Sequence, residues 1–127
     1  RNYRPSERYP EPRATICVWA LAADTDAEAR HLATTREYWR VGFEQGIRHP
    51  LVSPAFAEAY GYSPSERATI DALRRRAFVG TGDDVAERLQ TLATRLSLDE
   101  LVVVTWTYEP APRHRSYELL ARAFGLA

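Results

Sequence analysis

The sequence predicts an α/β fold in which helices cover a parallel sheet. Two strand-like stretches, residues 14–21 and 101–106, are apolar on both faces. Such two-sided strands are typical of a parallel sheet with helices on both sides. Helical patterns separate them from each other and from a very short strand at 78–79. Because strands and helices alternate without a dividing linker, we expect one α/β unit over residues 1–127, with right-handed crossovers.

The first strand places Ile16 and Val18 on one face and Cys17 and Trp19 on the other. We expect Cys17 to be a small buried hydrophobe, as most mid-strand cysteines are. A helix follows at Thr25, whose hydroxyl can accept a hydrogen bond from the third residue of the helix. Its apolar residues recur at helical spacing to about residue 45.

Residues 46–62 are rich in proline and aromatic side chains and have no sustained period, which predicts a long excursion. The next helix begins at a capping box formed by Ser63 and Glu66, with Pro64 at its first position. A third helix follows Thr81, and a last one is expected to open at Pro112 and to end at a glycine close to the end of the chain.

The turn Gly80-Thr81-Gly82 raises the question of a phosphate loop, because glycines between a strand and a helix often hold phosphate. Asp83 and Asp84 follow directly and would repel an anion at that helix end. Thr81 with Asp84 also has the spacing of a helix cap. We therefore favour helix capping, and a nucleotide-phosphate module at 80–82 is the least favoured hypothesis.

Composition excludes several classes of function. Seventeen basic and seventeen acidic residues give a net charge of zero, so no overall field favours nucleic acid or an anionic membrane. No apolar run approaches the ~20 residues that a membrane helix needs. All the basic residues are arginines, which excludes a Schiff-base lysine. A single cysteine is typical of a reducing compartment, so we expect a soluble, cytoplasmic protein.

Few residues suggest chemistry directly. The spacings of His31, His49 and His114 match no metal site, and no nucleophile motif is present, so we predict no metal and assign no catalytic residue. Ligands of parallel α/β folds bind at the carboxyl ends of strands. There the segment 105–109, TWTYE, offers aromatic rings, hydroxyls and a carboxylate. A ligand contact and simple closure of a barrel end remain equal interpretations of these aromatics.

Taken together, the stretches VWALAADTDAEAR (18–30), AFVGTGDDVAERLQTLATRLSLDELVVVTW (77–106) and RHRSYELLARAFGL (113–126) resemble the C-terminal part of bacterial luciferase-like flavin-dependent monooxygenases. The likeness runs over essentially the whole chain and is nearest to the alkanal monooxygenase-like branch. The family fold is a (β/α)8 barrel, so the resemblance implies that 14–21, 78–79 and 101–106 are strands six to eight. A complete barrel takes ~250 residues. We therefore expect this chain to be the C-terminal part of a luciferase-like barrel domain.

The resemblance also implies an activity: oxidation of an aldehyde or another small organic substrate with reduced FMN and O2. It implies that Thr105, Trp106 and Tyr108 line the cofactor end of the barrel, whereas most of the residues proposed for catalysis in the family lie in strands one to five, which are not among these three strands. A partial barrel should associate with its missing half or form a homo-oligomer, because its strand edges are open. The alternative is a stand-alone α/β module that binds a ligand or a protein and has no redox activity.

Overall fold

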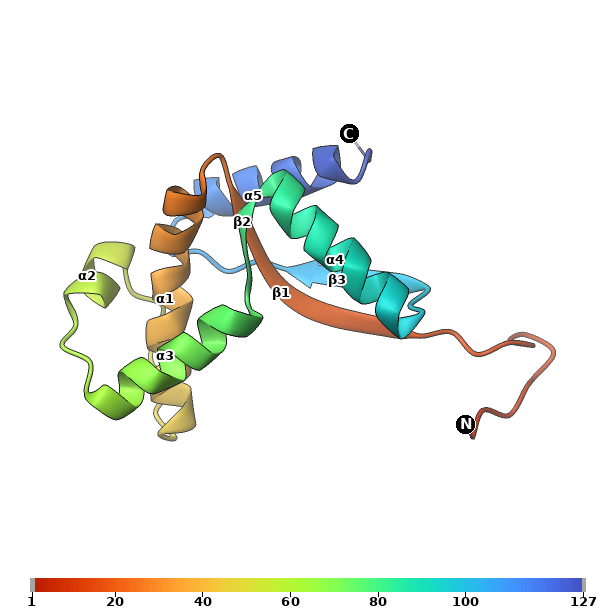
Figure 1. Cartoon of the computed structure of the whole chain (residues 1–127). Helices are drawn as coiled ribbons and strands as arrows, with labels where there is room; N and C mark the ends of the chain where they lie inside the picture. The colour runs from red at the N-terminus through yellow and green to blue at the C-terminus, as the bar shows by residue number, and fades with distance from the viewer. Residues whose placement is uncertain (1, 127) are drawn as a thin grey trace.

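The fold is seen in a computed structural model that describes residues 2–126. Three strands and five helices follow one another along the chain (Figure 1). Their order is β1 (Thr15–Ala23), α1 (Asp26–Glu44), α2 (Pro54–Ala59), α3 (Pro64–Arg76), β2 (Phe78–Thr81), α4 (Gly82–Leu96), β3 (Glu100–Val104) and α5 (Pro110–Ala123).

The three strands form one parallel sheet in the order β2-β1-β3, which confirms the predicted parallel α/β fold. The N-terminal half of β1 pairs with β3, from Thr15 opposite Glu100 to Trp19 opposite Val104. Its C-terminal half pairs with β2, where Ala20 lies opposite Phe78. The long first strand is therefore the common partner of the two shorter ones.

The strand order differs from the order expected for three successive barrel strands. Successive strands of a barrel are neighbours in chain order, whereas here β1 lies between β2 and β3. The two long apolar stretches of the sequence, β1 and β3, are thus direct parallel neighbours. The four-residue β2 lies along the end of β1 that leads into α1.

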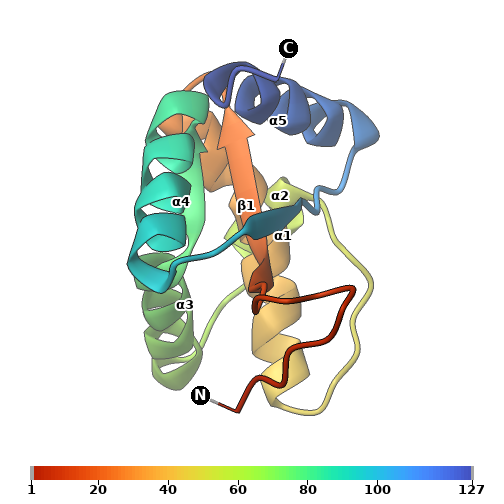
Figure 2. The same ribbon diagram turned by 90° about the vertical axis from the view of Figure 1, so that its right-hand side faces the viewer.

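One face of the sheet is packed against α4 and α5. Ala20 and Ala22 of β1 form a buried cluster with Val85, Leu89 and Leu120, the first two from α4 and the last from α5. Figure 2 shows α4 beside β1 and α1 behind it. Since alternate residues of a strand point to opposite faces, the residues next to these alanines point toward α1.

The opposite face is open where β1 pairs with β3, and here the prediction that both long strands are covered on two sides is wrong. Cys17 and Val102 are directly opposite each other, and both are exposed, Val102 to 44%. The expected burial of Cys17 is corrected by the same observation. The reason is that α1 packs against β2 and against the end of β1 near Trp19, whereas β3 lies on the other side of β1.

The helices begin where the local signals predict. Thr25 and Thr81 each accept a hydrogen bond from the third residue of their helix, and Ser63 forms a complete capping box with Glu66. Two details differ. The excursion contains the short helix α2, whose first turn is capped by the side chain of Ser53. The last helix begins at Pro110 rather than Pro112, because either proline suits a first turn.

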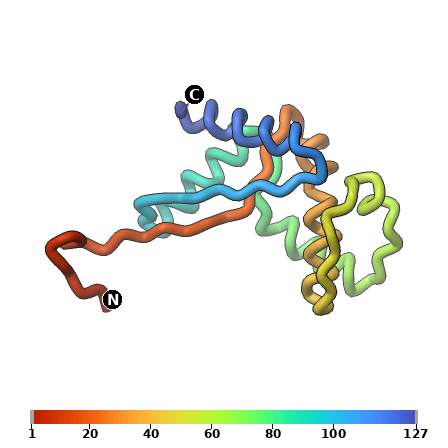
Figure 3. The backbone as a smooth tube through the Cα atoms, turned by 180° about the vertical axis from the view of Figure 1, so that it is seen from behind, coloured from red at the N-terminus to blue at the C-terminus, as the bar shows by residue number. Residues whose placement is uncertain are grey.

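Residues 2–14 carry no helix or strand and lead away from the helical half of the molecule (Figure 3). They are attached to the sheet where the backbone N–H of Ala14 donates to a carboxylate oxygen of Asp99 at 2.8 Å. None of the helices within residues 2–126 is long and apolar enough to cross a membrane.

Candidate functional site

The segment that follows β3 carries the three residues predicted to bind a cofactor. Thr105 lies just beyond the end of the strand and is buried, with 2% of its surface exposed. Its hydroxyl donates to the backbone oxygen of Ala20 at 2.7 Å, and its N–H donates to the hydroxyl of Tyr117 at 3.0 Å. Thr105 therefore fastens the segment to β1 and α5.

Trp106 and Tyr108 are more accessible. Trp106 is half-buried and packs edge-to-face on Trp39 of α1, with 5.1 Å between ring centroids. Tyr108 is 49% exposed. Between them Thr107 is buried and donates its hydroxyl to the backbone oxygen of Glu109. The structure thus brings all three predicted residues to one segment, and cofactor binding by them stays a prediction.

An arginine of α1 lies among the three tryptophans of the chain. The guanidinium carbon of Arg36 is 4.3 Å from the ring centroid of Trp19 and 6.0 Å from that of Trp106. Trp39 contacts Trp106 and stacks on Phe43 at 5.0 Å. We call Trp19, Arg36, Trp39 and Trp106 the Arg36 cluster.

In the part of the chain that the structure describes, Arg36, unlike Arg40 and Arg74, has no carboxylate within ion-pair distance. Within residues 2–126 its side chain makes no hydrogen bond or ion pair, and its Nε is buried without a partner, as is Nε1 of Trp19. Burial, followed by the charge of Arg40, lowers the pKa of Arg36 to about 10. Stacking on the indole offsets part of the cost of burying this cation.

A cavity of about 450 Å³ opens next to the Arg36 cluster, between α1, α2, α3 and β2. We call it the α1–β2 cavity. Trp19 and Arg36 are among its lining residues, and the others are partly aliphatic and partly charged. This size is within the range of small-molecule sites.

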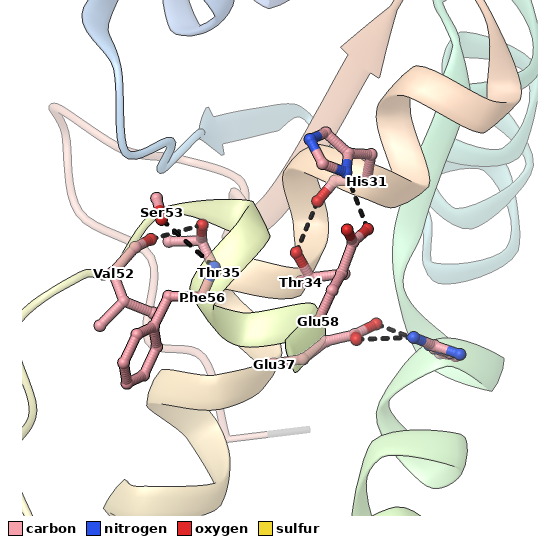
Figure 4. Close-up of polar contacts among 9 residues, drawn as sticks. His31, Thr34, Thr35, Glu37, Val52, Ser53, Phe56 and Glu58 are labelled. Atoms are coloured by element: carbon pink, nitrogen blue, oxygen red, sulfur yellow. Dashed lines mark hydrogen bonds and ion pairs between the residues drawn. The ribbon is translucent and has the colours of Figure 1, made fainter. Parts of the chain in front are cut away.

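Charged side chains on the cavity wall are joined in pairs (Figure 4). Arg74 of α3 forms two hydrogen bonds to Glu37 of α1, at 2.7 and 2.8 Å. This contact raises the pKa of Arg74. Nδ1 of His31 lies 2.7 Å from a carboxylate oxygen of Glu58, which ties α2 to α1.

A second cavity of about 390 Å³ adjoins the first and shares Glu37 and Arg74 with it. Tyr60 and Tyr62 belong to its wall. Burial is the main reason that the pKa of Tyr62 rises to about 12, and the nearby carboxylate of Glu37 adds to it. The tyrosine hydroxyl therefore stays protonated at neutral pH.

The glycine turn before α4 is a helix cap, as predicted. The side chain of Thr81 accepts a hydrogen bond from the N–H of Asp84, and Asp83 and Asp84 occupy the first turn. A Cβ at Gly80 would lie 2.8 Å from a carboxylate oxygen of Asp84. This turn therefore presents a carboxylate where a phosphate would have to bind, which disfavours an anion site.

The carboxyl end of β1 is occupied by an ion pair. Arg115 of α5 donates to both carboxylate oxygens of Asp24, at 2.6 and 3.1 Å, and this hydrogen bonding lowers the pKa of Asp24. Within residues 2–126 no group of three or more His, Cys, Asp or Glu side chains is arranged to hold a metal ion.

Sequence reasoning did not identify the Arg36 cluster or the α1–β2 cavity. Trp19, Arg36 and Trp106 are far apart in the sequence and meet only when α1 folds back along β1. One signal was present: α1 carries arginine at 36 and 40 among its aromatic residues rather than on a separate polar face. His31 was interpreted as an ordinary helix residue, and it lies on the cavity wall.

Three comparisons relate the chain to known proteins. It is 38% identical over 98% of its length to the uncharacterized protein YwcH of Bacillus subtilis (strain 168). It is 28% identical over 93% of its length to a luciferase-like monooxygenase of Escherichia coli (strain K12). The crystal structure of apo-MsnO8 matches 98% of the chain with a TM-score of 0.81 and 30% identity. No family model matches the chain.

In each case the chain matches a minor part of the other protein. It spans 38% of YwcH, 35% of the luciferase-like monooxygenase and 39% of the MsnO8 chain. The α/β fold, as part of a (β/α)8 barrel of luciferase-like type, is thereby confirmed. The resemblance to luciferase-like monooxygenases is supported over this part of their length.

Proposed function

We propose that this chain is the C-terminal part of a luciferase-like flavin-dependent monooxygenase that acts with O2 on an aldehyde or another small organic substrate. The observation that carries the proposal is the match to a luciferase-like monooxygenase over 93% of the chain. The position of the aromatic residues supports it, because Trp106 follows the carboxyl end of β3, where parallel α/β folds bind ligands.

The face on which these residues lie fits a place inside a barrel. Helices α4 and α5 pack on the face of Ala20 and Ala22. In a barrel the helices are outside, so the part of the opposite face that carries the exposed Cys17 and Val102 would be the interior one. Helix α1 covers the same face near Trp19, and its Trp39 contacts Trp106. The aromatic segment would therefore lie at the border between the covered part of this face and its open, interior part.

The residues present fit the ring of a flavin better than its phosphate. Trp106 and Tyr108 offer partly exposed aromatic surface, and Thr105 holds their segment against β1. The turn at Gly80 is disfavoured for phosphate by Asp84. When bound, reduced FMN would supply the electrons for the reaction of O2. The role of Thr105, Trp106 and Tyr108 would be to bind and orient the ring and to exclude water from it.

The test is titration of FMN fluorescence with this chain, alone and mixed with the part of YwcH that the chain does not match. We expect saturable quenching. Tyr108→Ala should weaken binding by a factor of about 10 or more, because an aromatic stacking contact is lost. The matched control is Tyr9→Ala, since Tyr9 is equally exposed, at 49%, and lies in the irregular N-terminal segment.

Equal affinities for the Tyr108→Ala and Tyr9→Ala variants would contradict the placement of the flavin ring. Failure of both preparations to bind FMN would contradict the flavin proposal and favour the stand-alone binding module. We also propose that the missing barrel strands cover the open face at Cys17 and Val102. The YwcH part should then slow the reaction of the Cys17 thiol with a water-soluble disulfide reagent, whereas an unchanged rate would contradict this.

A further inference from the structure

We propose that the α1–β2 cavity binds a small organic carboxylate with a short apolar tail, and that Arg36 anchors its charged group. This inference goes beyond the flavin proposal and does not depend on it, because none of Thr105, Trp106 and Tyr108 lines the cavity. Its elements are the cavity, one cation without a counterion, and an apolar wall beside that cation.

Most charged side chains on the cavity wall already bond to partners within the fold. Glu37 is paired with Arg74, and Glu58 is hydrogen-bonded to His31. The other two arginines of the wall bond outside it: Arg30 to Asp26 at 2.7 Å, and Arg88 to Asp84 at 3.4 Å. None of these side chains offers an uncommitted positive charge to a ligand.

Arg36 is the exception. It lines the cavity, it stacks on Trp19, and within residues 2–126 no acceptor bonds to any of its nitrogen atoms. A partly buried guanidinium without an acceptor is unfavourable, so an oxygen anion that reaches it from the cavity gains a strong hydrogen bond. Burial is also the main reason that the pKa of Arg36 is lowered to about 10, and the neighbouring charge of Arg40 adds to this effect.

The number of uncommitted cations on the cavity wall favours a ligand with a single negative charge. One uncompensated cation matches one carboxylate, and the planar guanidinium can donate two parallel hydrogen bonds to it. A phosphate dianion would require a second free cation, and Arg30 and Arg88 are both committed to aspartates. Glu37 and Glu58 on the same wall further oppose a doubly charged ligand.

The aliphatic residues of the cavity wall favour a ligand whose carboxylate carries a short apolar tail. Aliphatic side chains contribute part of the lining, and a chain of a few carbons that packs on them would lose contact with water. Those side chains are Ala27, Ala33, Leu73, Ala77 and Val79.

The chain contains its own probe for the test. All three tryptophans belong to the Arg36 cluster, so their fluorescence reports on a ligand at Arg36. We would titrate the full chain with sodium hexanoate, and with hexanol, hexylammonium and inorganic phosphate as comparison probes. We expect a saturable change with hexanoate at concentrations at which the other three give none.

Two variants distinguish the anchor from its surroundings. Arg36→Gln should weaken hexanoate binding by about tenfold or more, since it removes a charge-assisted hydrogen bond. Arg30→Gln should leave it unchanged, because Arg30 is an exposed residue on the same wall. Circular dichroism would establish that both variants fold.

Two results would overturn the proposal: equal binding of hexanoate by the Arg36→Gln variant, or a wild-type response no stronger to hexanoate than to hexanol. If Arg36→Gln does not fold, NMR of the wild-type chain decides. The indole N–H resonance of Trp19 should shift with hexanoate and not with hexanol, and its failure to shift would reject the site.

Discussion

The two faces of the sheet differ in composition although the same strand supplies both. On the face under α4 and α5, Ala20 and Ala22 pack against Leu89 and Leu120, all of them buried. On the other face Trp19 packs against Arg36, which has buried surface and no counterion. The first face is what a stable core requires. Among the described residues, the second face contains buried polar atoms without hydrogen-bond partners, which destabilise a fold. Such unfavourable groups are typical of functional sites.

The two faces also differ in the way their polar groups are satisfied. Beneath α5, the buried Ser116 accepts a hydrogen bond from the N–H of Ala22 at 2.9 Å, although the residues are far apart in the sequence. Near α1, the buried nitrogens of Trp19 and Arg36 have no partner within residues 2–126. We therefore expect substitutions on the first face to change stability, and substitutions on the second to change binding with little loss of stability.

We expect the largest loss of stability from a comparison of two leucines, Leu89 in the core under α4 and Leu73 on the wall of the α1–β2 cavity. Leu89→Ala should lower the free energy of unfolding by about 2–5 kcal/mol, because Leu89 is fully buried and its removal leaves a cavity in the core. Leu73→Ala removes the same atoms from a half-buried wall that already borders a cavity, so it should cost clearly less. Urea unfolding of the two variants provides the measurement, and equal losses would contradict the distinction between the faces.

The next effect concerns Ser116. Ser116→Ala should cost about 1–3 kcal/mol of unfolding free energy, because it leaves the N–H of Ala22 buried without an acceptor. The matched control is Ser65→Ala. The Ser65 hydroxyl is also hydrogen-bonded, to Ser63 at 3.1 Å, but this contact is exposed, so its loss should stay within about 0.5 kcal/mol. A loss for Ser116→Ala as small as that of the control would show that water replaces the missing hydroxyl.

Two arginines of the α1–β2 cavity sharpen the comparison further. Arg74→Met should cost about 1 kcal/mol, because it leaves Glu37, whose side chain is only 12% exposed, without its partner. Arg36→Met should cost nothing and can gain up to about 1 kcal/mol, because it removes a desolvated cation and keeps an apolar contact with Trp19. Thermal unfolding of both variants at neutral pH gives the answer. A loss for Arg36→Met equal to that for Arg74→Met would mean that Arg36 is structural.

Much of the fold was predictable because its signals are local. A cap needs only residues three apart, so Thr25, Ser63 and Thr81 were identified as helix starts from the sequence. The apolar runs of β1 and β3 were likewise sufficient to predict a parallel sheet, although not that these two strands pair directly. The ends of the strands were predicted less accurately: the strand predicted at 101–106 ends at Val104, so Thr105 and Trp106 lie beyond it.

The remaining features depend on contacts between distant residues. The apolar character of Cys17 predicts a buried side chain, but its exposure depends on where α1 lies across the sheet. The position of β1 between β2 and β3 also depends on tertiary packing and not on periodicity. The Arg36 cluster needs three segments to meet, and the arginines among the aromatic residues of α1 are a local signal that does not specify the other two segments.

We expect the smallest loss of stability from the ion pair at the carboxyl end of β1. Asp24→Asn removes the ion pair with Arg115 and should lower the unfolding temperature only slightly at pH 7, because the Asp24 side chain is 53% exposed. The pKa of Asp24 is lowered in the fold by Arg115. The unfolded chain therefore takes up a proton first as the pH falls, and the stabilisation is present at neutral pH and lost in acid.

The difference in unfolding temperature between wild type and Asp24→Asn should accordingly be largest near neutral pH and vanish as the pH falls through the lowered pKa of Asp24. The control is a double-mutant cycle with Arg115→Gln. Arg115→Gln should cost less in the Asp24→Asn background than in the wild type, because the carboxylate that it contacts is already gone. Additive losses would mean that the pair contributes nothing, and that α5 is held against β1 by its apolar contacts and by Ser116 alone.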